Sequence, residues 1–509
     1  MLIFLIIIAI INRLGLTLWT KTNFDTYGHL YFIKEIKTQK VGPFDEIETK
    51  VSGSKKFKSQ FLWHWFLSFL PTKFLNTYHK YINPILDILF SIFIYLITLN
   101  IGYKIEIAFQ LSVLYLFTPL WFSRFSIGPR VKSLTPRLLS EILTTIFFMV
   151  TILPLKIDLI IQSFVSVFLG SIVILSFRFG LQAILFISII FAIFSLNLFP
   201  LLTLVVSIFL SVLISRGKFI ETLKFQAVHL KWYFKKNLKG EMSISNRNNI
   251  RFHLNKLKEG SKRVKFKDLI SIILINNSIG SIILKLPLYI FILFFTIRGI
   301  FENVIYFNDL FYLILSGTII FFVVSTPLFL FIGEAERYLS HISYFIILNY
   351  LILVKETNFI YLTNILIFYG VIYWIFEIGY SLKKNLIKSS EESNLVFNYI
   401  ENLDKKIILA FPYHAIGGVW KIMLNTKHEV VCHMASDKDY RNYIEQKYSL
   451  KYPYLNLNLV EEMHIEFGLN LIIIEKNALD KNGFKNWAPP PNWTTKNLNA
   501  LKIQVIERL

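Results

Sequence analysis

The fold is decided by the apolar run at residues 2–19, LIFLIIIAIINRLGLTLW, and by the polar turn soon after it, Phe24-Asp25-Thr26-Tyr27-Gly28-His29-Leu30-Tyr31. An apolar run of about 17–25 residues can cross the ~30 Å hydrocarbon core of a membrane. No basic segment precedes the run and no small-residue cleavage site follows it, so we interpret it as a retained helix. An acid directly after such a helix is costly unless it is solvated, paired or functional.

The composition extends this interpretation to most of the chain. Of the 509 residues, 54% are hydrophobic and the mean hydropathy is +0.53, whereas soluble domains are roughly 45–50% apolar. We therefore predict a mainly α, polytopic transmembrane bundle of about eleven spans. The expected helices lie near 2–20, 82–100, 107–122, 138–154, 159–177, 181–195, 198–215, 269–297, 310–332, 342–354 and 359–378.

The net charge and the cysteine content limit the classes of partner and of metal site that the chain can have. Cys432 is the sole cysteine, which excludes an internal disulfide and a cysteine-based metal cluster. The net charge of +21 is typical of membrane-protein loops that face anionic lipid, so we expect membrane lipids and no nucleic acid as partners. The abundance of Lys, Asn and Ile suggests a low-GC bacterium, and hence a multi-pass protein of the bacterial inner (cytoplasmic) membrane.

The chain divides after residue 382. We assign 1–382 to a transmembrane domain with a first outer loop, 21–80, and a basic loop, 216–268. We assign 383–509 to a small, soluble C-terminal α/β domain, with strands at 406–411 and 469–474 and a helix at 438–446.

The basic loop raises a question of membrane topology. It carries fifteen Lys or Arg against four acids, which favours the cytoplasmic side. Counting every expected helix instead puts this loop on the same side as 21–80. We give the charge bias more weight, and therefore expect one of the three short spans between 159 and 215 to be re-entrant.

Two groups of residues are candidates for chemistry. In the first loop, Asp25 and His29 are four residues apart and share one helix face, and they could act as a base with its partner or as half of a metal site with His64. The alternative is a helix N-cap at Asp25, for a helix over 27–36, with an exposed imidazole.

Arginines form the second group. Arg124, Arg130 and Arg137 lie in a basic turn, 123–137, and Arg337 lies in Gly333-Glu334-Ala335-Glu336-Arg337-Tyr338-Leu339 at the end of an apolar run. Guanidinium groups match phosphate oxygens, so these residues could hold a lipid phosphate or diphosphate. The alternatives are an Arg137–Glu141 ion pair and an internal Glu–Arg pair at 334–337.

These features together resemble the GT-C glycosyltransferases, multi-spanning enzymes that take sugars from polyprenyl-phosphate carriers. The matching features are the acid of Phe24-Asp25-Thr26-Tyr27-Gly28-His29-Leu30, a long first loop with interfacial helices, and a soluble domain after the last span. The resemblance implies that Asp25 is the catalytic base or a metal ligand, and that Arg337 meets the carrier phosphate. Many members carry a second, paired acid, which the turn 123–137 lacks; Asp45, Glu46 and Glu48 could substitute.

The implied reaction transfers a hexose from a polyprenyl-phosphate donor to an acceptor hydroxyl on a glycan, lipid or protein at the outer face, as in glycan biosynthesis for the cell envelope. His29, His64, Arg124, Arg130, Arg137 and Arg337 would bind substrate, and a divalent metal is a cofactor hypothesis. The competing interpretations are a flippase or transporter for polyprenyl-linked glycans, and a glycan polymerase or ligase of another membrane fold. A transporter typically shows charges through its midplane and two similar halves, which this sequence does not.

Overall fold

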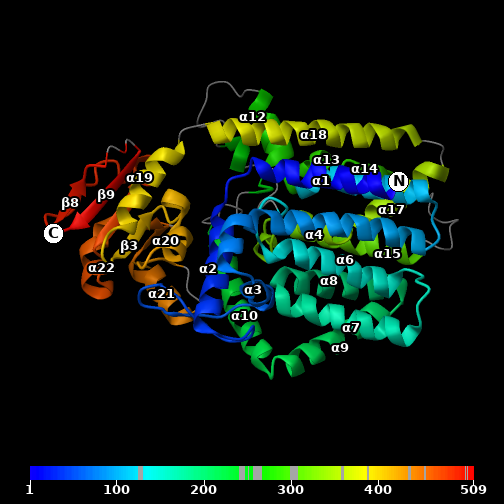
Figure 1. Ribbon diagram of the computed structural model, residues 1–509, viewed down its shortest axis with the longest axis horizontal. Coiled ribbons are helices and arrows are strands. Elements are labelled where there is room, and N and C mark those ends of the chain that lie inside the picture. Colours follow the sequence, from blue (N-terminus) through cyan, green and yellow to red (C-terminus); the bar gives the residue numbers. More distant parts are fainter. Residues whose placement is uncertain are drawn as a thin grey trace. The chain divides into compact units, whose positions relative to one another are not determined.

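The computed structural model describes residues 1–123, 130–239, 247–249, 252–255, 266–297, 308–356, 360–386, 389–433, 437–451, 454–498, 500 and 502–509. They form two compact units. The first, the helical unit, contains 1–20, 78–220 and 230–382. The second, the mixed unit, contains 21–77, 221–229 and 383–509. Both units are therefore assembled from stretches far apart in the sequence, as the colours of Figure 1 show.

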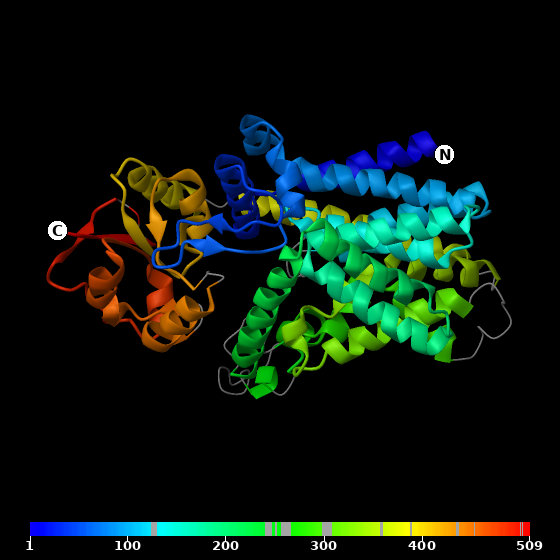
Figure 2. The same ribbon diagram turned by 90° about the horizontal axis from the view of Figure 1, so that it is seen from below.

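The helical unit consists mainly of apolar helices (Figures 1 and 2). The structure is mainly helical, as the sequence predicts. The principal helices of this unit, some of which extend past its borders, are α1 (Leu2–Leu18), α4 (Thr72–Asn100), α5 (Ile105–Phe117), α6 (Pro136–Ile152), α7 (Leu159–Ser176), α8 (Arg178–Ser195), α9 (Phe199–Ile214), α10 (Lys218–Leu238), α12 (Phe266–Ile270), α13 (Ser278–Lys285), α14 (Leu288–Ile297), α15 (Asn308–Val324), α16 (Glu336–His341), α17 (Ser343–Glu356) and α18 (Ile360–Leu386).

Fewer helices than expected are long enough to span a membrane. Within the described ranges, four are long and apolar enough: Thr72–Asn100, Leu159–Ser176, Arg178–Ser195 and Tyr361–Lys383. A fifth arises if α9 and α10, which meet at a bend of 110°, count as one span. The count of eleven is therefore not confirmed. The main reason is length, because apolar helices such as α1, α5, α15 and α17 are shorter than a straight crossing requires.

The expected helix at 269–297 is interrupted twice. A π-helical turn at Ser271–Ile275 follows α12, and Asn277 then caps α13 by accepting hydrogen bonds from two backbone N–H groups. Pro287 separates α13 from α14 because proline offers no backbone donor and clashes with the preceding turn. The interruptions place the end of α13 and its Lys285 inside the unit.

Small residues allow α7 and α9 to approach each other closely. A Cβ atom at Gly170 of α7 would lie 2.3 Å from the Ser207 Oγ of α9, a distance that no real contact shows. Ser207 also donates a hydrogen bond to the Val167 carbonyl at 3.0 Å. Glycine and serine at helix interfaces allow backbones to pack closely where lipid provides no hydrophobic driving force.

The mixed unit is built on a five-stranded sheet of order β4-β3-β7-β9-β8. β3 pairs in parallel with β4 and β7, whereas β7–β9 and β9–β8 are antiparallel. The strands predicted at 406–411 and 469–474 are confirmed as the buried central strands β3 and β7. The elements are α19 (Ser389–Glu401), β3 (Ile407–Phe411), α20 (Val419–Asn425), β4 (Glu429–Val430), α21 (Lys438–Lys447), β5 (Ser449–Lys451), β6 (Tyr454–Leu455), α22 (Val460–Phe467), β7 (Leu471–Glu475), α23 (Lys476–Lys481), β8 (Trp493–Lys496) and β9 (Ile503–Arg508).

The first loop is part of the same unit. It folds as α2 (Phe24–Gln39), a β1–β2 hairpin (Ile47–Glu48 and Lys56–Phe57) and α3 (Leu62–Ser68). α2 packs on α20, and Ser52 donates its backbone N–H to the Val430 carbonyl at 2.9 Å. The sequence assigned 21–80 to the transmembrane domain, whereas the structure groups 21–77 with the C-terminal residues.

Part of the basic loop also belongs to the mixed unit. Residues 221–229 of α10 are grouped with it, and Glu221 forms an ion pair with Lys58 of the first loop. The bend of 110° between α9 and α10 marks a broken span or a re-entrant loop, so the side of the membrane expected for the basic loop stays a prediction.

Candidate functional site

A network of buried charges begins in the first helix. Arg13, in the middle of α1, donates from Nε to Asp87 of α4 at 2.5 Å and from Nη1 to the Leu116 carbonyl at 2.8 Å. Both charged side chains are 0% exposed. Tyr115 donates to the second oxygen of Asp87 at 2.5 Å. Since an unpaired charge inside a membrane protein is costly, this pair joins α1 to α4 and α5.

Arg130 continues the network and is almost fully enclosed. Its guanidinium donates to Tyr115 Oη at 3.0 Å, lies 3.5 Å from Asp87 and forms a close ion pair with Glu141 of α6. The Trp121 ring covers it at 3.7 Å from the ring centroid. These contacts on several sides indicate a structural role, as a bridge between the turn before α6 and the helices around it.

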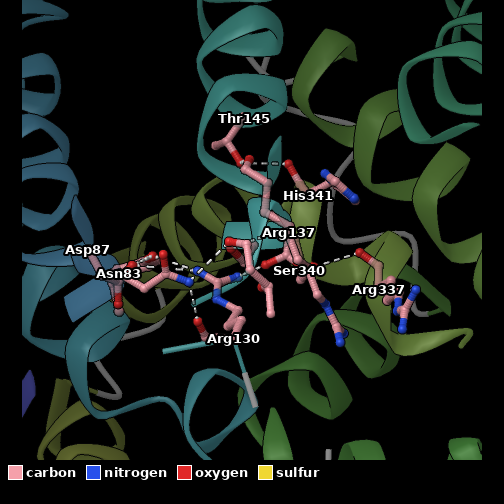
Figure 3. A network of polar contacts seen from close by, with 12 residues as sticks. Asn83, Asp87, Arg130, Arg137, Thr145, Arg337, Ser340 and His341 are labelled. Carbon is pink, nitrogen blue, oxygen red and sulfur yellow. Dashed lines mark hydrogen bonds and ion pairs between the residues drawn. The ribbon is translucent and has the colours of Figure 1, made fainter. Parts of the chain in front are cut away.

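Arg137 and Arg337 meet at one carboxylate. Arg137, at the start of α6, lies 3.3 Å from both Glu141 and Glu334, and Arg337 of α16 donates to the same Glu334 at 3.2 Å. Figure 3 labels Arg130, Arg137 and Arg337 within the network of polar contacts. The two alternatives considered from sequence, an Arg137–Glu141 pair and a Glu334–Arg337 pair, are thus both present. One carboxylate shared by two guanidinium groups leaves positive charge uncompensated.

A second group of charges surrounds Glu336. This carboxylate pairs with Arg247, lies 3.2 Å from Lys285 Nζ and accepts a hydrogen bond from Ser281 Oγ at 2.6 Å. The two groups line a common cavity of about 20 Å³, together with Leu120 and Ser340. Such a volume has room for one water molecule.

Positive charge exceeds negative charge in this cluster, which we call the arginine cluster. Six cations face four carboxylates: Arg13, Arg130, Arg137, Arg247, Lys285 and Arg337 against Asp87, Glu141, Glu334 and Glu336. Within the described residues, several buried guanidinium nitrogens have no hydrogen-bond partner, among them Nη1 of Arg247 and of Arg337. Buried donors of this kind are suited to bind an anion.

Asp25 lies in the mixed unit, in the first turn of α2. The N-cap of this helix is Asn23, whose side chain accepts from the Thr26 N–H at 2.9 Å, so the capping role considered for Asp25 belongs to Asn23. The Asp25 side chain is exposed. An exposed carboxylate at a helix N-terminus is favoured by the helix dipole and remains accessible to a substrate.

His29 and His64 come together as a pair. His29 of α2 and His64 of α3 share a hydrogen bond of 2.8 Å between Nδ1 and Nε2, and their rings stack at 5.0 Å. Burial lowers the pKa of His29 to about 4, and burial together with the neighbouring His29 lowers the pKa of His64 well below its usual value. Both imidazoles are therefore neutral at pH 7, and one ring donates its N–H to the unprotonated nitrogen of the other.

The structure thus brings the candidate residues together in two separate groups. Arg130, Arg137 and Arg337 belong to the helical unit, whereas Asp25, His29 and His64 belong to the mixed unit. Arg124 lies outside the described residues. Sequence reasoning missed Arg13 and Arg247. For Arg13 a signal was available, since an arginine within an apolar span requires a buried partner.

A metal ligand set does not emerge from the part of the chain that the structure describes. There, no group of three or more His, Cys, Asp or Glu side chains is arranged to hold a metal ion. The facing nitrogens of His29 and His64 are used by each other. The metal hypothesis for these histidines and Asp25 stays a prediction.

The chain shares its fold with an enzyme of known structure, on which it superposes over nearly its whole length. That enzyme is the oligosaccharyltransferase of Archaeoglobus fulgidus. Its apo crystal structure has a TM-score of 0.52 and 12% sequence identity over 96% of this chain and 71% of that one.

A second structure of the archaeal oligosaccharyltransferase, tethered to an acceptor peptide containing the NVT sequon, has a TM-score of 0.51 at 12% identity and covers 94% of this chain and 68% of that one. No protein-family model matches the chain, and none of the curated proteins matches it in sequence. The resemblance expected from the sequence is therefore supported at the level of the fold.

Proposed function

We propose that this chain is an integral membrane glycosyltransferase that moves a sugar from a polyprenyl-phosphate carrier to an acceptor hydroxyl. Its fold and its apolar helices support this class of protein. The observation that carries the proposal is the excess of buried guanidinium donors in the arginine cluster. A phosphate leaving group gains negative charge as the glycosidic bond breaks, and fixed cations stabilise that charge.

Within the cluster, Arg137 and Arg337 are suited to contact the phosphate. Their side chains keep 13% and 15% of their surface exposed, against 5% for Arg130. Since the cavity of about 20 Å³ is too small for a phosphate group, the donor phosphate would bind at the exposed edges of these two arginines and compete with Glu334 for their guanidinium groups. Arg130 and Arg13 would hold the cluster in place.

In the proposed reaction, Asp25 takes the proton from the acceptor hydroxyl. The acceptor oxygen then forms a bond to the anomeric carbon, and the bond from that carbon to the phosphate oxygen breaks. The lipid phosphate leaves with the electron pair, and the proton stays on the carboxyl of Asp25 until solvent removes it. The exposure of Asp25 supports this role, because the base needs access to both acceptor and water.

The finer identity of the reaction belongs to the same proposal. We propose a hexose as the transferred sugar, the outer face of a bacterial inner membrane as its place, and cell-envelope glycan synthesis as its context. Because the archaeal neighbour was captured with an acceptor peptide, a protein acceptor is included beside a glycan or a lipid.

The test is transfer by the purified protein. Polyprenyl phosphates that carry radiolabelled hexoses are incubated with the native chain and with membrane extracts that supply the acceptor. We expect label to move from the lipid fraction to the acceptor only when the protein is present. Label that stays on the lipid with every donor, in the presence of folded protein, would contradict the proposal.

A further inference from the structure

A cavity in the C-terminal part of the mixed unit lies apart from every residue discussed above. Its volume is about 430 Å³, within the usual range of about 300–1,000 Å³ for small-molecule sites. Two segments contribute its described lining: one holds Leu450 of β5 together with Asn456 and Asn458, and the other is the loop 482–487 that follows α23.

The walls of the cavity are fixed by hydrogen bonds between and within these segments. Trp487 donates its indole N–H to the Leu457 carbonyl at 3.2 Å and so joins the two segments. The Asn456 backbone N–H donates to the Tyr448 carbonyl at 2.8 Å, and its side chain accepts from the Asn458 N–H at 3.1 Å. Phe484 is buried against Phe411 of β3, with ring centroids 5.7 Å apart. The cavity is therefore preformed.

Amide groups and one aromatic face dominate its lining. Four asparagines contribute: Asn456, Asn458, Asn482 and Asn486. Each primary amide offers donors and an acceptor, which matches hydroxyl groups that both donate and accept. Because the indole N–H of Trp487 is already bound internally, the half-buried ring presents apolar surface to a ligand.

The charge of the lining argues against other ligand classes. Among the described residues that line the cavity, Lys485 is the one that carries a charge and none is a carboxylate, so this lining does not match a metal cation. A single exposed lysine is too little positive charge for a nucleic acid or a polyphosphate. Neutral amides beside an aromatic face suit a ligand with many hydroxyls and apolar C–H faces.

We infer that this cavity is a glycan-binding site, with Trp487 stacking on a sugar ring and Asn458 and Asn486 holding its hydroxyls. Lys485 adds a preference for acidic sugars. That the bound glycan is the acceptor rests on the proposed function; the binding itself requires neither a donor nor turnover.

The experiment measures binding by the full-length protein in a detergent without a sugar head group. The probes are maltohexaose, chitohexaose and hexagalacturonate, each titrated to about 10 mM and followed by saturation-transfer NMR. We expect at least one probe to bind. Trp487→Ala should weaken that binding at least about tenfold, and Asn486→Ala should weaken it severalfold. Trp487→Phe, which keeps a ring, should retain part of it.

Asn402→Ala is the matched control, because Asn402 is an exposed asparagine that directly follows α19 and lies outside the cavity. This variant should bind the probe as the native chain does. Thermal unfolding checks that each variant is folded. The inference is overturned if none of the probes binds, or if folded Trp487→Ala and Asn486→Ala bind with native affinity. If the protein binds a glycan probe but transfers no sugar, the proposed function is wrong and the glycan-binding site stands. If it transfers sugar but binds no probe, the glycan-binding site is wrong and the proposed function stands.

Discussion

At the scale of single residues, the arginines of the cluster differ in how far their guanidinium donors remain available to a ligand. Arg130 is enclosed by Glu141, Tyr115 and Trp121. Arg337 shares Glu334 with Arg137, packs on the Phe179 ring at 4.0 Å and keeps Nη1 without a partner among the described residues. From this contrast we infer that Arg130 holds the cluster in place and that Arg337 binds the phosphate.

Arg337→Ala should therefore raise the KM for the lipid donor by about 10- to 100-fold, the loss expected for one charge-assisted hydrogen bond. Arg337→Lys should recover part of the affinity, because it keeps the charge and loses the fork. Donor titrations in the transfer assay measure this. Arg178→Ala is the control, since Arg178 is also a half-buried arginine beside Phe179. An unchanged donor KM in Arg337→Ala would remove Arg337 from the phosphate site.

The histidine pair predicts a pH dependence of stability. The pKa of His29 is about 4 in the folded chain and near 6.5 when unfolded, so the unfolded state binds more protons between these values. Stability should thus be complete above about pH 6.5 and fall as the pH drops toward about 4. The native melting temperature should decrease by a few degrees more between about pH 7 and pH 5 than that of His29→Gln/His64→Gln. Equal decreases would show that the pair does not titrate as described.

The sequence alone predicted some of the residues of the arginine cluster. Arg130, Arg137 and Arg337 were selected for their charge at the ends of apolar runs, and they do converge on one cluster. Arg247 could not be found, because it sits in a long basic loop where nothing distinguishes it from its neighbours. A capping role for α2 was considered for Asp25 as the alternative to a base, whereas Asn23 is the cap; Asp and Asn both favour that position.

At the scale of elements, buried ion pairs join helices that are distant in the sequence. Arg13 ties α1 to α4 through Asp87, and its Nη1 reaches the end of α5 at the Leu116 carbonyl. Pairing of this kind fixes the arrangement of helices that lipid cannot order by the hydrophobic effect.

Asp87→Asn should destabilise the helical unit by about 3–5 kcal/mol, because the buried Arg13 would lose its counter-charge. The change is measured as the free energy of unfolding in detergent. Arg13→Met combined with Asp87→Leu should recover most of the loss, since it removes both charges. Glu106→Gln, at an exposed acid in the first turn of α5, serves as the control. A loss in Asp87→Asn no larger than in this control would show that the pair is not structural.

Periodicity and composition predicted the positions of strands and helices better than they predicted which helices span a membrane. The strands β3 and β7 are uninterrupted apolar runs, the pattern of strands buried on both faces, and both were found. The run 269–297 was taken as continuous because its apolar character hides the break at Pro287 and the π-helical turn before it. Which helices cross a membrane depends on tilt and packing, which composition does not encode.

At the scale of the whole molecule, the mixed unit draws on three distant stretches of sequence. Glu221 pairs with Lys58, and Arg441 of α21 lies 3.3 Å from His229 of α10. A local sequence pattern cannot predict this grouping, because the grouping depends on contacts between residues more than a hundred positions apart.

The grouping predicts that α10 and the C-terminal residues face the same side of the membrane. In a Cys432→Ser background, Lys239→Cys and Asp404→Cys place single thiols at exposed positions, one after α10 and one before β3. A membrane-impermeant thiol reagent applied to intact cells, and then to inverted vesicles, should label both from the same side. Labelling from opposite sides would contradict the grouping of 221–229 with 383–509.

The most direct test of the central claim is the rate of sugar transfer by Asp25→Asn. The account predicts a decrease in kcat of ~10²–10⁴-fold with folding and donor KM unchanged, because the amide cannot take the acceptor proton. Asp439→Asn is the matched control: Asp439 is also an exposed acid in the first turn of a helix, α21, and its loss removes the same favourable dipole interaction. It should keep native activity. If Asp25→Asn transfers sugar as fast as Asp439→Asn, Asp25 is not the base and the proposed mechanism is wrong.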